Sequence, residues 1–166
     1  FKPKTQCDTE LLAWGLDNFG IKFLESLDSM HGFAYYDIAN QKLILSRDHA
    51  GVKPVFYAEI EEGIVFGSEI KGMLDKVPGA RKLDKLAHST FHYASVSPLR
   101  NTFFNNIKKL LPGETIVYDI FNKKITNTYR EYIKSTRDVK FDPVEFKQQV
   151  QDAVKRCSIG DKKIGL

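Results

Sequence analysis

The chain has 166 residues, and its 42% hydrophobic and 12% aromatic content suits one globular core, or parts of two, rather than a disordered protein. Its net charge of +4 is spread over separate lysine pairs, which favours a solvated surface over a nucleic-acid partner. No apolar run approaches the roughly 20 residues of a membrane span, and Cys7 and Cys157 are too far apart to indicate a disulfide framework or a zinc site. We therefore expect a soluble, cytoplasmic protein that binds neither a membrane nor, within this chain, a metal.

The first predicted element is a helix that begins after Cys7 and ends at Gly20. Asp8 and Thr9 carry oxygen atoms that can cap free amide groups, and Glu10 falls in the first turn, where negative charge is favoured. A second short helix is expected over residues 21–28. The residues predicted to face the core are Leu12, Leu16 and Phe19 in the first helix and Ile21, Leu24 and Leu27 in the second.

Four strand-sized segments follow between residues 30 and 71, in which aromatic and β-branched residues recur between short turns. Their order predicts a β-meander. Arg47 and Asp48 follow the second apolar run, Gly51 allows the chain to reverse, and Pro54 fixes the backbone as the third strand begins. The four segments span residues 30–38, 41–48, 52–59 and 62–69.

The rest of the chain alternates between helical and strand patterns before a polar linker. The composition changes at this linker, so we expect a second domain to begin there. The apolar residues that end the chain resemble the first half of a buried strand. The predicted elements are helices at 68–76 and 83–96, strands at 102–110, 114–120, 123–132 and 162–166, the linker at 135–143, and an amphipathic helix at 144–157.

Asp8 is the best candidate for a binding residue. A carboxylate at a helix start lies near free amide groups and the positive end of the helix dipole, so it stays ionised and can hold a substrate ammonium group. A simple helix cap is the alternative, and the residues alone favour it, because Asp is common at caps. Cys7 lies at the same helix start, but no neighbouring base is identifiable, so we do not expect it to be a nucleophile.

Other charged or metal-binding side chains are predicted to be structural. Arg47 and Asp48 are expected to form ion pairs and turn hydrogen bonds, since either charge is costly to bury alone. Glu69 is expected to cap the short helix or to interact with its dipole. His88 and His92 lie four residues apart on a predicted helix, but no third ligand is identifiable, so a surface pair is favoured over a metal site.

Three segments in order resemble a known family: MHGFAYYD from Met30, RDHAGVKPVFYA from Arg47 and FGSEIKGML from Phe66. Together they resemble the glutaminase domain of class II glutamine amidotransferases. Among these the chain is most similar to the asparagine synthetases (glutamine-hydrolysing), a branch that residues 83–96 and 102–114 select. His31 stands where this family usually has an apolar residue.

The resemblance implies an α+β fold in two parts. Residues 1–137 are expected to form the later part of a four-layer αββα sandwich of the N-terminal-nucleophile glutaminases. Residues 138–166 are expected to form the linker, first helix and first strand of an α/β ATP-pyrophosphatase-type synthetase domain. The resemblance also implies that Asp8 binds the α-amino group of glutamine, which reverses the preference for a simple cap.

Family members use an N-terminal Cys as the nucleophile, and Phe1 has no nucleophilic atom. No catalytic residue is therefore expected in this chain, which is expected to be an internal fragment that is inactive alone. For the parent protein, the resemblance implies that glutamine is hydrolysed through a thioester. The ammonia then converts aspartate, activated by ATP and magnesium, to asparagine. ATP and magnesium are expected to bind outside this chain.

Some alternatives stay open. A related class II amidotransferase with another acceptor would share these segments, since the acceptor site is expected beyond Leu166. A non-catalytic binding or scaffold module is a third hypothesis, against which the unfinished apolar strand at the end of the chain argues. A homodimer is also left open.

Overall fold

The computed structural model describes residues 2–5, 7–95, 97–130 and 140–159. The chain divides into two compact units, Phe1–Ile133 and Lys134–Leu166. The predicted domain boundary between residues 137 and 138 lies outside the described residues, as do most of the predicted linker and the predicted strand at 162–166. Within the described ranges, no helix is both long enough and apolar enough to cross a membrane.

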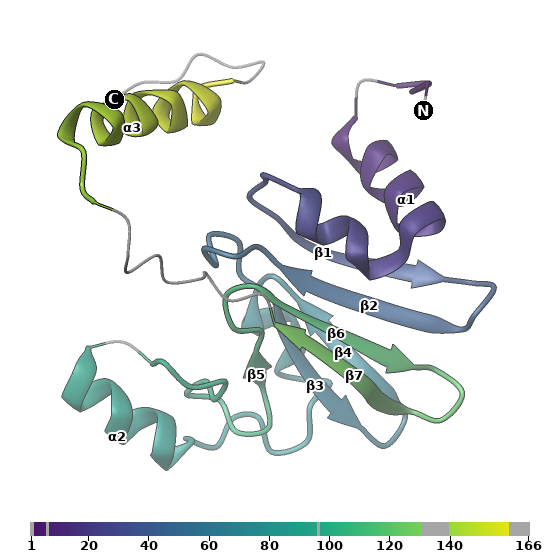
Figure 1. Cartoon of the computed structure of the whole chain (residues 1–166). Coiled ribbons are helices and arrows are strands. Elements are labelled where there is room, and N and C mark those ends of the chain that lie inside the picture. The colour runs from purple at the N-terminus through teal and green to yellow at the C-terminus, as the bar shows by residue number, and fades with distance from the viewer. Residues whose placement is uncertain (1, 6, 96, 131–139, 160–166) are drawn as a thin grey trace. The chain divides into compact units, whose positions relative to one another are not determined.

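The first unit contains two antiparallel sheets (Figure 1). Together with their helices they confirm the predicted α+β class. The four-stranded sheet has the order β1-β2-β6-β7, with β1 at Gly32–Asp37, β2 at Lys42–Arg47, β6 at Glu114–Asp119 and β7 at Lys124–Arg130. The three-stranded sheet has the order β4-β3-β5, with β3 at Phe56–Ile60, β4 at Gly63–Gly67 and β5 at Lys108–Lys109.

The four strands predicted between residues 30 and 71 form, but the prediction of a single meander is wrong. β1 pairs with β2 in one sheet, whereas β3 pairs with β4 in the other. The intervening segment leads from one sheet to the other. Gly51 turns it with a φ of +68°, which favours glycine, and Pro54 has no N–H to donate to a ladder. The second neighbour of β2 is instead β6, with Ser46 opposite Thr115.

The main core lies between the two sheets. Leu45 and Ile116 from the four-stranded sheet are fully buried there, together with Tyr57 from the three-stranded sheet. β2 and β6 are buried on both faces along most of their length, as central strands covered on both sides are. A second cluster of Ala58, Met73, Val77, Ala80 and Ile107 includes residues of β3 and of the segment that follows β4.

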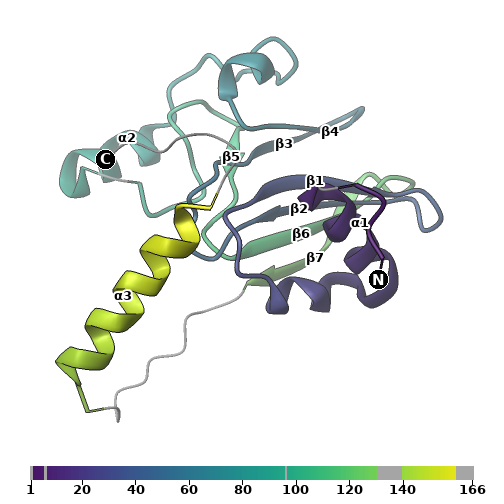
Figure 2. The same ribbon diagram turned by 90° about the horizontal axis from the view of Figure 1, so that it is seen from above.

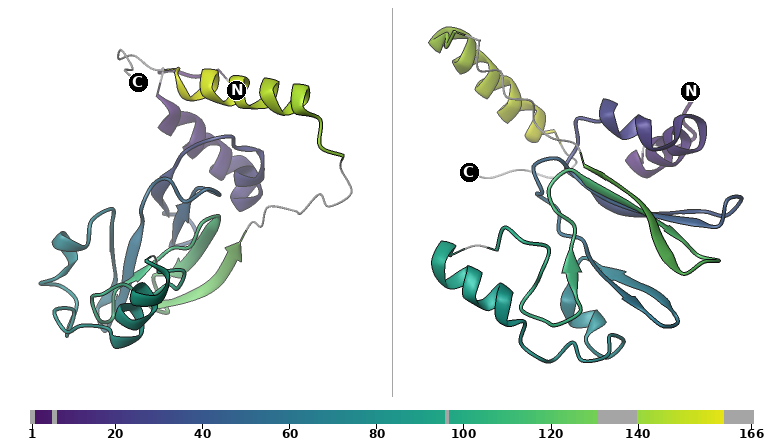
Figure 3. Two further views of the ribbon diagram at one scale, coloured as in Figure 1. Left: turned by 90° about the vertical axis from the view of Figure 1, so that its left-hand side faces the viewer. Right: turned by 60° about the horizontal axis from the view of Figure 1, so that its bottom comes forward.

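α1 at Asp8–Phe19 and the 3-10 helix η1 at Gly20–Ser26 lie over the outer face of the four-stranded sheet (Figures 2 and 3). α1 follows Cys7 and ends at Gly20, as predicted. Leu16 is buried, but Phe19 is 57% exposed, so its predicted core position is wrong. Its ring packs edge-on against Trp14, with the ring centres 5.4 Å apart.

The later part of the unit holds the 3-10 helix η2 at Ile70–Met73 and α2 at Lys85–Ala94. Both predicted helices form. The strand predicted over residues 102–110 is wrong for most of its length, because only β5 is a strand. The hydroxyl of Thr102 donates to the carbonyl oxygens of Phe104 and Ile107 and stabilises a turn there instead.

In the second unit, α3 spans Pro143–Cys157, which confirms the predicted amphipathic helix. The Asp142 carboxylate accepts hydrogen bonds from the backbone N–H groups of Val144 and Glu145, and Pro143 occupies the first turn. Both features are typical helix-start signals. Its large apolar side chains, Val144, Phe146, Val150 and Val154, are exposed.

Candidate functional site

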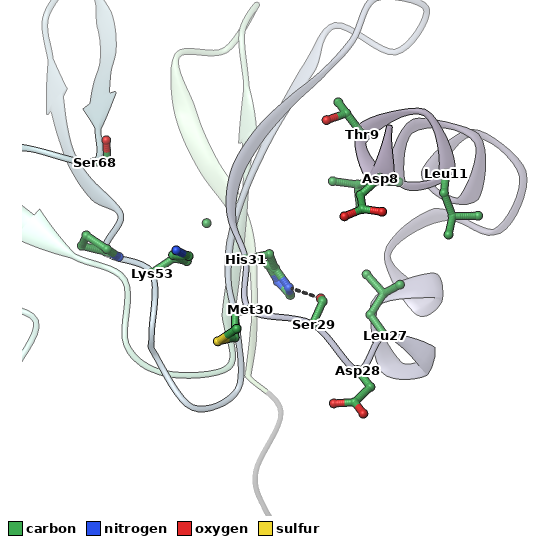
Figure 4. Close-up of a pocket in the computed structure, with 13 residues that line it drawn as sticks. Asp8, Thr9, Leu11, Leu27, Asp28, Ser29, Met30, His31, Lys53 and Ser68 are labelled. Atoms are coloured by element: carbon green, nitrogen blue, oxygen red, sulfur yellow. Dashed lines mark hydrogen bonds between the residues drawn. The ribbon is translucent and has the colours of Figure 1, made fainter. Parts of the chain in front are cut away.

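A cavity of about 580 Å³ lies in the first unit, between α1 and the segments that lead into β1 and β3. Figure 4 shows the Asp8 carboxylate on the α1 side, Lys53 and Ser68 on the opposite side, and His31 between them. The remaining side chains supply apolar walls and further polar groups. They are Thr9, Leu11, Leu12, Leu27, Asp28, Ser29, Met30 and Pro54.

Asp8 lines this cavity as the first residue of α1. It is not the N-cap: that position belongs to Cys7, whose side chain makes no capping hydrogen bond. Within the described residues, no group donates a hydrogen bond to the Asp8 carboxylate. The charge therefore lies at the positive end of the helix dipole without a hydrogen-bond donor from the residues that the structure describes, an arrangement suited to a cationic ligand.

Glu10, in the same turn of α1, has a different role. Its carboxylate accepts hydrogen bonds from the backbone N–H groups of Lys4, at 2.8 Å, and Thr5, at 2.7 Å, and from the Thr5 hydroxyl at 2.6 Å. The Thr5 hydroxyl and these amides hold the pKa of Glu10 below its usual value. Glu10 thus fixes the chain before the helix and leaves Asp8 as the carboxylate of this turn that faces the cavity.

Cys7 is exposed and lies beside Asp8. The hydroxyl and backbone N–H of Thr9 hold the pKa of the Cys7 thiol below its usual value. Within the described residues, no imidazole hydrogen-bonds to this thiol, so no general base for a thiol nucleophile is identified. The interpretation that Cys7 is not a nucleophile stays a prediction.

His31 joins the cavity to a buried polar chain. Its Nδ1 lies 2.9 Å from the Ser29 hydroxyl, and its Nε2 lies 3.3 Å from the hydroxyl of Ser46. Ser46 in turn contacts the Thr115 hydroxyl at 2.7 Å, which links β2 to β6. Burial lowers the pKa of His31, and the nearby charge of Asp48 opposes this only in part. The neutral imidazole is therefore favoured.

His31 also contributes to a second, smaller cavity of about 30 Å³, which Ser46 and Thr115 line as well. In the sequence, His31 departs from the family pattern, and no role was predicted for it. The sequence did offer a signal, since a polar ring stands where the family has an apolar residue. A half-buried imidazole needs hydrogen-bond partners, so polar neighbours could have been predicted.

Arg47 and Asp48 stabilise the turn that leads to Lys53 at the cavity, and both were predicted to have a structural role. The buried Asp48 carboxylate accepts hydrogen bonds from the N–H groups of Val52, at 2.9 Å, and Lys53, at 3.0 Å. The Arg47 guanidinium donates to the carbonyl oxygens of Gly51, Lys53 and Leu110. The predicted turn hydrogen bonds are thus present, and they place Lys53 at the cavity. The predicted ion pairs are wrong: among the described residues the ion pairs are Arg81–Asp75 and Arg100–Glu114, and neither includes Arg47 or Asp48.

The remaining predicted residues lie elsewhere. Glu69 is the residue before η2, but its side chain makes no capping hydrogen bond, so the predicted side-chain cap is wrong. His88 and His92 are exposed neighbours on α2. In the part of the chain that the structure describes, no three His, Cys, Asp or Glu side chains lie close enough together to hold a metal ion.

Comparison with known proteins gives one family match and several similar relatives. Residues 1–132 match the family model described as a glutamine amidotransferase domain. "Asparagine synthetase [glutamine-hydrolyzing] 2" of Bacillus subtilis is 28% identical over 181 residues, covering 98% of this chain and 24% of the relative. "Asparagine synthetase [glutamine-hydrolyzing]" of Mus musculus is 26% identical over 190 residues, covering 99% and 29%.

The protein of the same name from Rattus norvegicus is 33% identical over 122 residues, covering 72% of this chain and 18% of the relative. The chain thus spans less than a third of the length of each of these three curated relatives. The segments that carried the resemblance, from Met30 to Leu74, lie inside the matched range of the family model.

Proposed function

The chain belongs to the family of glutamine amidotransferase domains, and from this we propose that the cavity beside α1 binds glutamine, as part of a glutamine-dependent asparagine synthetase. The names of the similar relatives from bacteria and mammals support this assignment. The proposed product of the parent protein is asparagine, made from aspartate and ammonia.

One observation supports glutamine binding most directly. The Asp8 carboxylate faces the cavity at the start of α1 without a hydrogen-bond donor among the described residues. An α-ammonium group would supply three donors and the opposite charge. The aliphatic part of glutamine would contact the apolar side chains of the cavity, such as Leu12 and Leu27.

We also propose that the 166-residue chain binds glutamine without hydrolysing it. Its two thiols, Cys7 and Cys157, are exposed, and no described imidazole hydrogen-bonds to either. Amide hydrolysis by a thiol needs an adjacent base to activate the sulfur. The nucleophile would then be supplied from outside these residues.

The finer fold assignment is part of the same proposal. The two facing sheets, with α1 and η1 over the four-stranded sheet and Met73 of η2 packed against Ala58 of β3, support a four-layer αββα sandwich for residues 1–137. The capped, amphipathic α3 supports the start of a synthetase domain within residues 138–166. ATP and magnesium would bind outside this chain and supply the activation of aspartate.

The test is a calorimetric titration of the chain with L-glutamine and with 4-carbamoylbutanoate, which lacks only the α-amino group. We expect the chain to prefer glutamine. Asp8→Asn should weaken glutamine binding by about 10- to 100-fold, because one charge-assisted contact is lost, and should leave 4-carbamoylbutanoate binding unchanged. Glu62→Gln, which removes an exposed carboxylate outside the cavity, is the matched control.

Equal binding of the two ligands, or full glutamine affinity in Asp8→Asn, would contradict the role of Asp8. An absence of glutamine binding by the unmodified chain would contradict the proposed site. Release of glutamate by the purified chain, measured in the same samples, would show that the proposal of a non-hydrolysing chain is wrong.

A further inference from the structure

α2 carries two imidazole rings whose nitrogen atoms meet. Nε2 of His88 and Nε2 of His92 lie 3.2 Å apart, and the ring centres are separated by 4.5 Å with the planes at 77°. Residues four apart on a helix share one face, so the helix itself places the two rings side by side. Both side chains are exposed, which leaves the pair accessible from solvent.

The separation of these nitrogen atoms matches the geometry of a metal site. Zinc binds imidazole nitrogen at about 2.0–2.1 Å and prefers four tetrahedral ligands, so two nitrogen ligands on one ion lie about 3.3–3.4 Å apart. The observed separation of 3.2 Å between the two Nε2 atoms is close to this ligand–ligand distance. Small rotations of the two rings would direct both lone pairs to one ion.

We propose that His88 and His92 form a two-imidazole site for a divalent transition-metal ion, with Zn²⁺ as the best fit. The ion would keep two further positions for water or for an anionic ligand. This site shares no residue with the cavity beside α1 and does not depend on the proposed glutamine function. Without the ion, one ring donates an N–H to the other; binding requires that ring to carry its proton on Nδ1, and no proton is lost overall.

The surrounding structure holds the pair in place. The Asp84 carboxylate accepts hydrogen bonds from the backbone N–H of Ala87, at 2.9 Å, and from the Asn101 side chain, at 2.7 Å, which fixes the start of α2. The Phe103 ring packs against His88, with the ring centres 6.5 Å apart. A restrained pair loses less side-chain entropy when it binds an ion.

The test is a calorimetric titration of the untagged chain with ZnCl₂ at pH 7.5. Cys7→Ser and Cys157→Ser are present in every sample, because both thiols are exposed and would also bind zinc. We expect one ion per chain. His88→Ala and His92→Ala should each weaken binding by about tenfold or more, because the second imidazole adds to an ion already held by the first. MgCl₂ should give no signal, since magnesium prefers oxygen ligands.

The matched control combines Ser89→His with His92→Ala. It keeps the number of imidazoles but moves them to adjacent positions, which do not face each other on a helix. This variant should bind zinc as weakly as His92→Ala. Equal zinc affinity in the unmodified pair and in this control would overturn the proposal, as would an unchanged zinc affinity in His88→Ala, or no binding by the unmodified pair.

Discussion

The guanidinium of Arg47 donates from Nη1 to the carbonyl oxygen of Leu110 at 2.7 Å, across 63 positions of the sequence. Arg47 ends β2 in the four-stranded sheet, and Leu110 directly follows β5 in the three-stranded sheet. The same side chain also donates to the carbonyl oxygens of Gly51 and Lys53. The Arg47 side chain thus links the segment between β2 and β3, residues 48–55, to both sheets.

Arg47→Lys should therefore destabilise the protein by about 1–3 kcal/mol, because a single ammonium group cannot replace the planar fork that reaches three carbonyl groups. The free energy of unfolding in urea measures this. Arg81→Lys is the control, since Arg81 forms an exposed ion pair with Asp75 and should change stability by less than about 1 kcal/mol. Equal losses in the two variants would contradict the bridging role of Arg47.

Gly51→Ala tests the turn between the sheets. Its φ is +68°, and an added Cβ would lie 2.8 Å from the Pro112 ring and 3.2 Å from the Arg47 guanidinium. Gly79 has a similar φ of +73°, but there the nearest atoms to an added Cβ are 3.7 Å away. Gly51→Ala should therefore cost about 1–3 kcal/mol more than Gly79→Ala, because only the first adds a steric clash to the strain of the left-handed backbone. Thermal unfolding of the two variants compares them directly, and a smaller loss at Gly51 would disprove the clash.

His31 should make the stability depend on pH. Because burial lowers its pKa in the folded state, the unfolded chain takes up a proton more readily. The stability provided by the neutral ring is present above the unfolded pKa of about 6.5 and decreases as the pH falls below it. Urea unfolding at pH 7.5 and pH 5.5 should show a loss for the unmodified chain.

His31→Phe should reduce this difference between the two pH values, although it also removes the hydrogen bonds to Ser29 and Ser46. His92→Gln, which removes an exposed imidazole on α2 that does not contribute to the pKa shift of His31, is the control and should keep the dependence. An unchanged acid loss in His31→Phe would show that another group is responsible.

Local signals in the sequence predicted most elements of the fold. The start of α1 after Cys7 and its end at Gly20 were predicted correctly. The apolar and β-branched runs located β1, β2, β3 and β4, because the periodicity of a strand or helix depends on residues that are close in the sequence. The pairing of β2 with β6 was missed, since it depends on contacts between distant segments that no local pattern records.

The candidate site shows the same division. Asp8 was named in advance, because the family resemblance outweighed the simple helix cap that its place at the helix start alone favoured; its binding role stays a prediction. Lys53 and Ser68 were not named in advance, because Lys53 reaches the cavity through the turn that Asp48 and Arg47 stabilise, and Ser68 reaches it from the end of β4 in the other sheet. The chain from His31 through Ser46 to Thr115 was also missed, because it crosses from the segment before β1 to β2 and β6.

The position of β6 beside β2 also has a consequence for the order of synthesis. When β2 leaves the ribosome, its partner β6 has not yet been translated, and the β3-β4 hairpin and α2 must be made first. Until β6 is made, the apolar side chains of β2 lack their contacts with β6, and one edge of β2 is unpaired. Completion of this sheet therefore comes late in synthesis, and a nascent chain that stalls before Asp119 leaves the β6-facing edge of β2 unpaired.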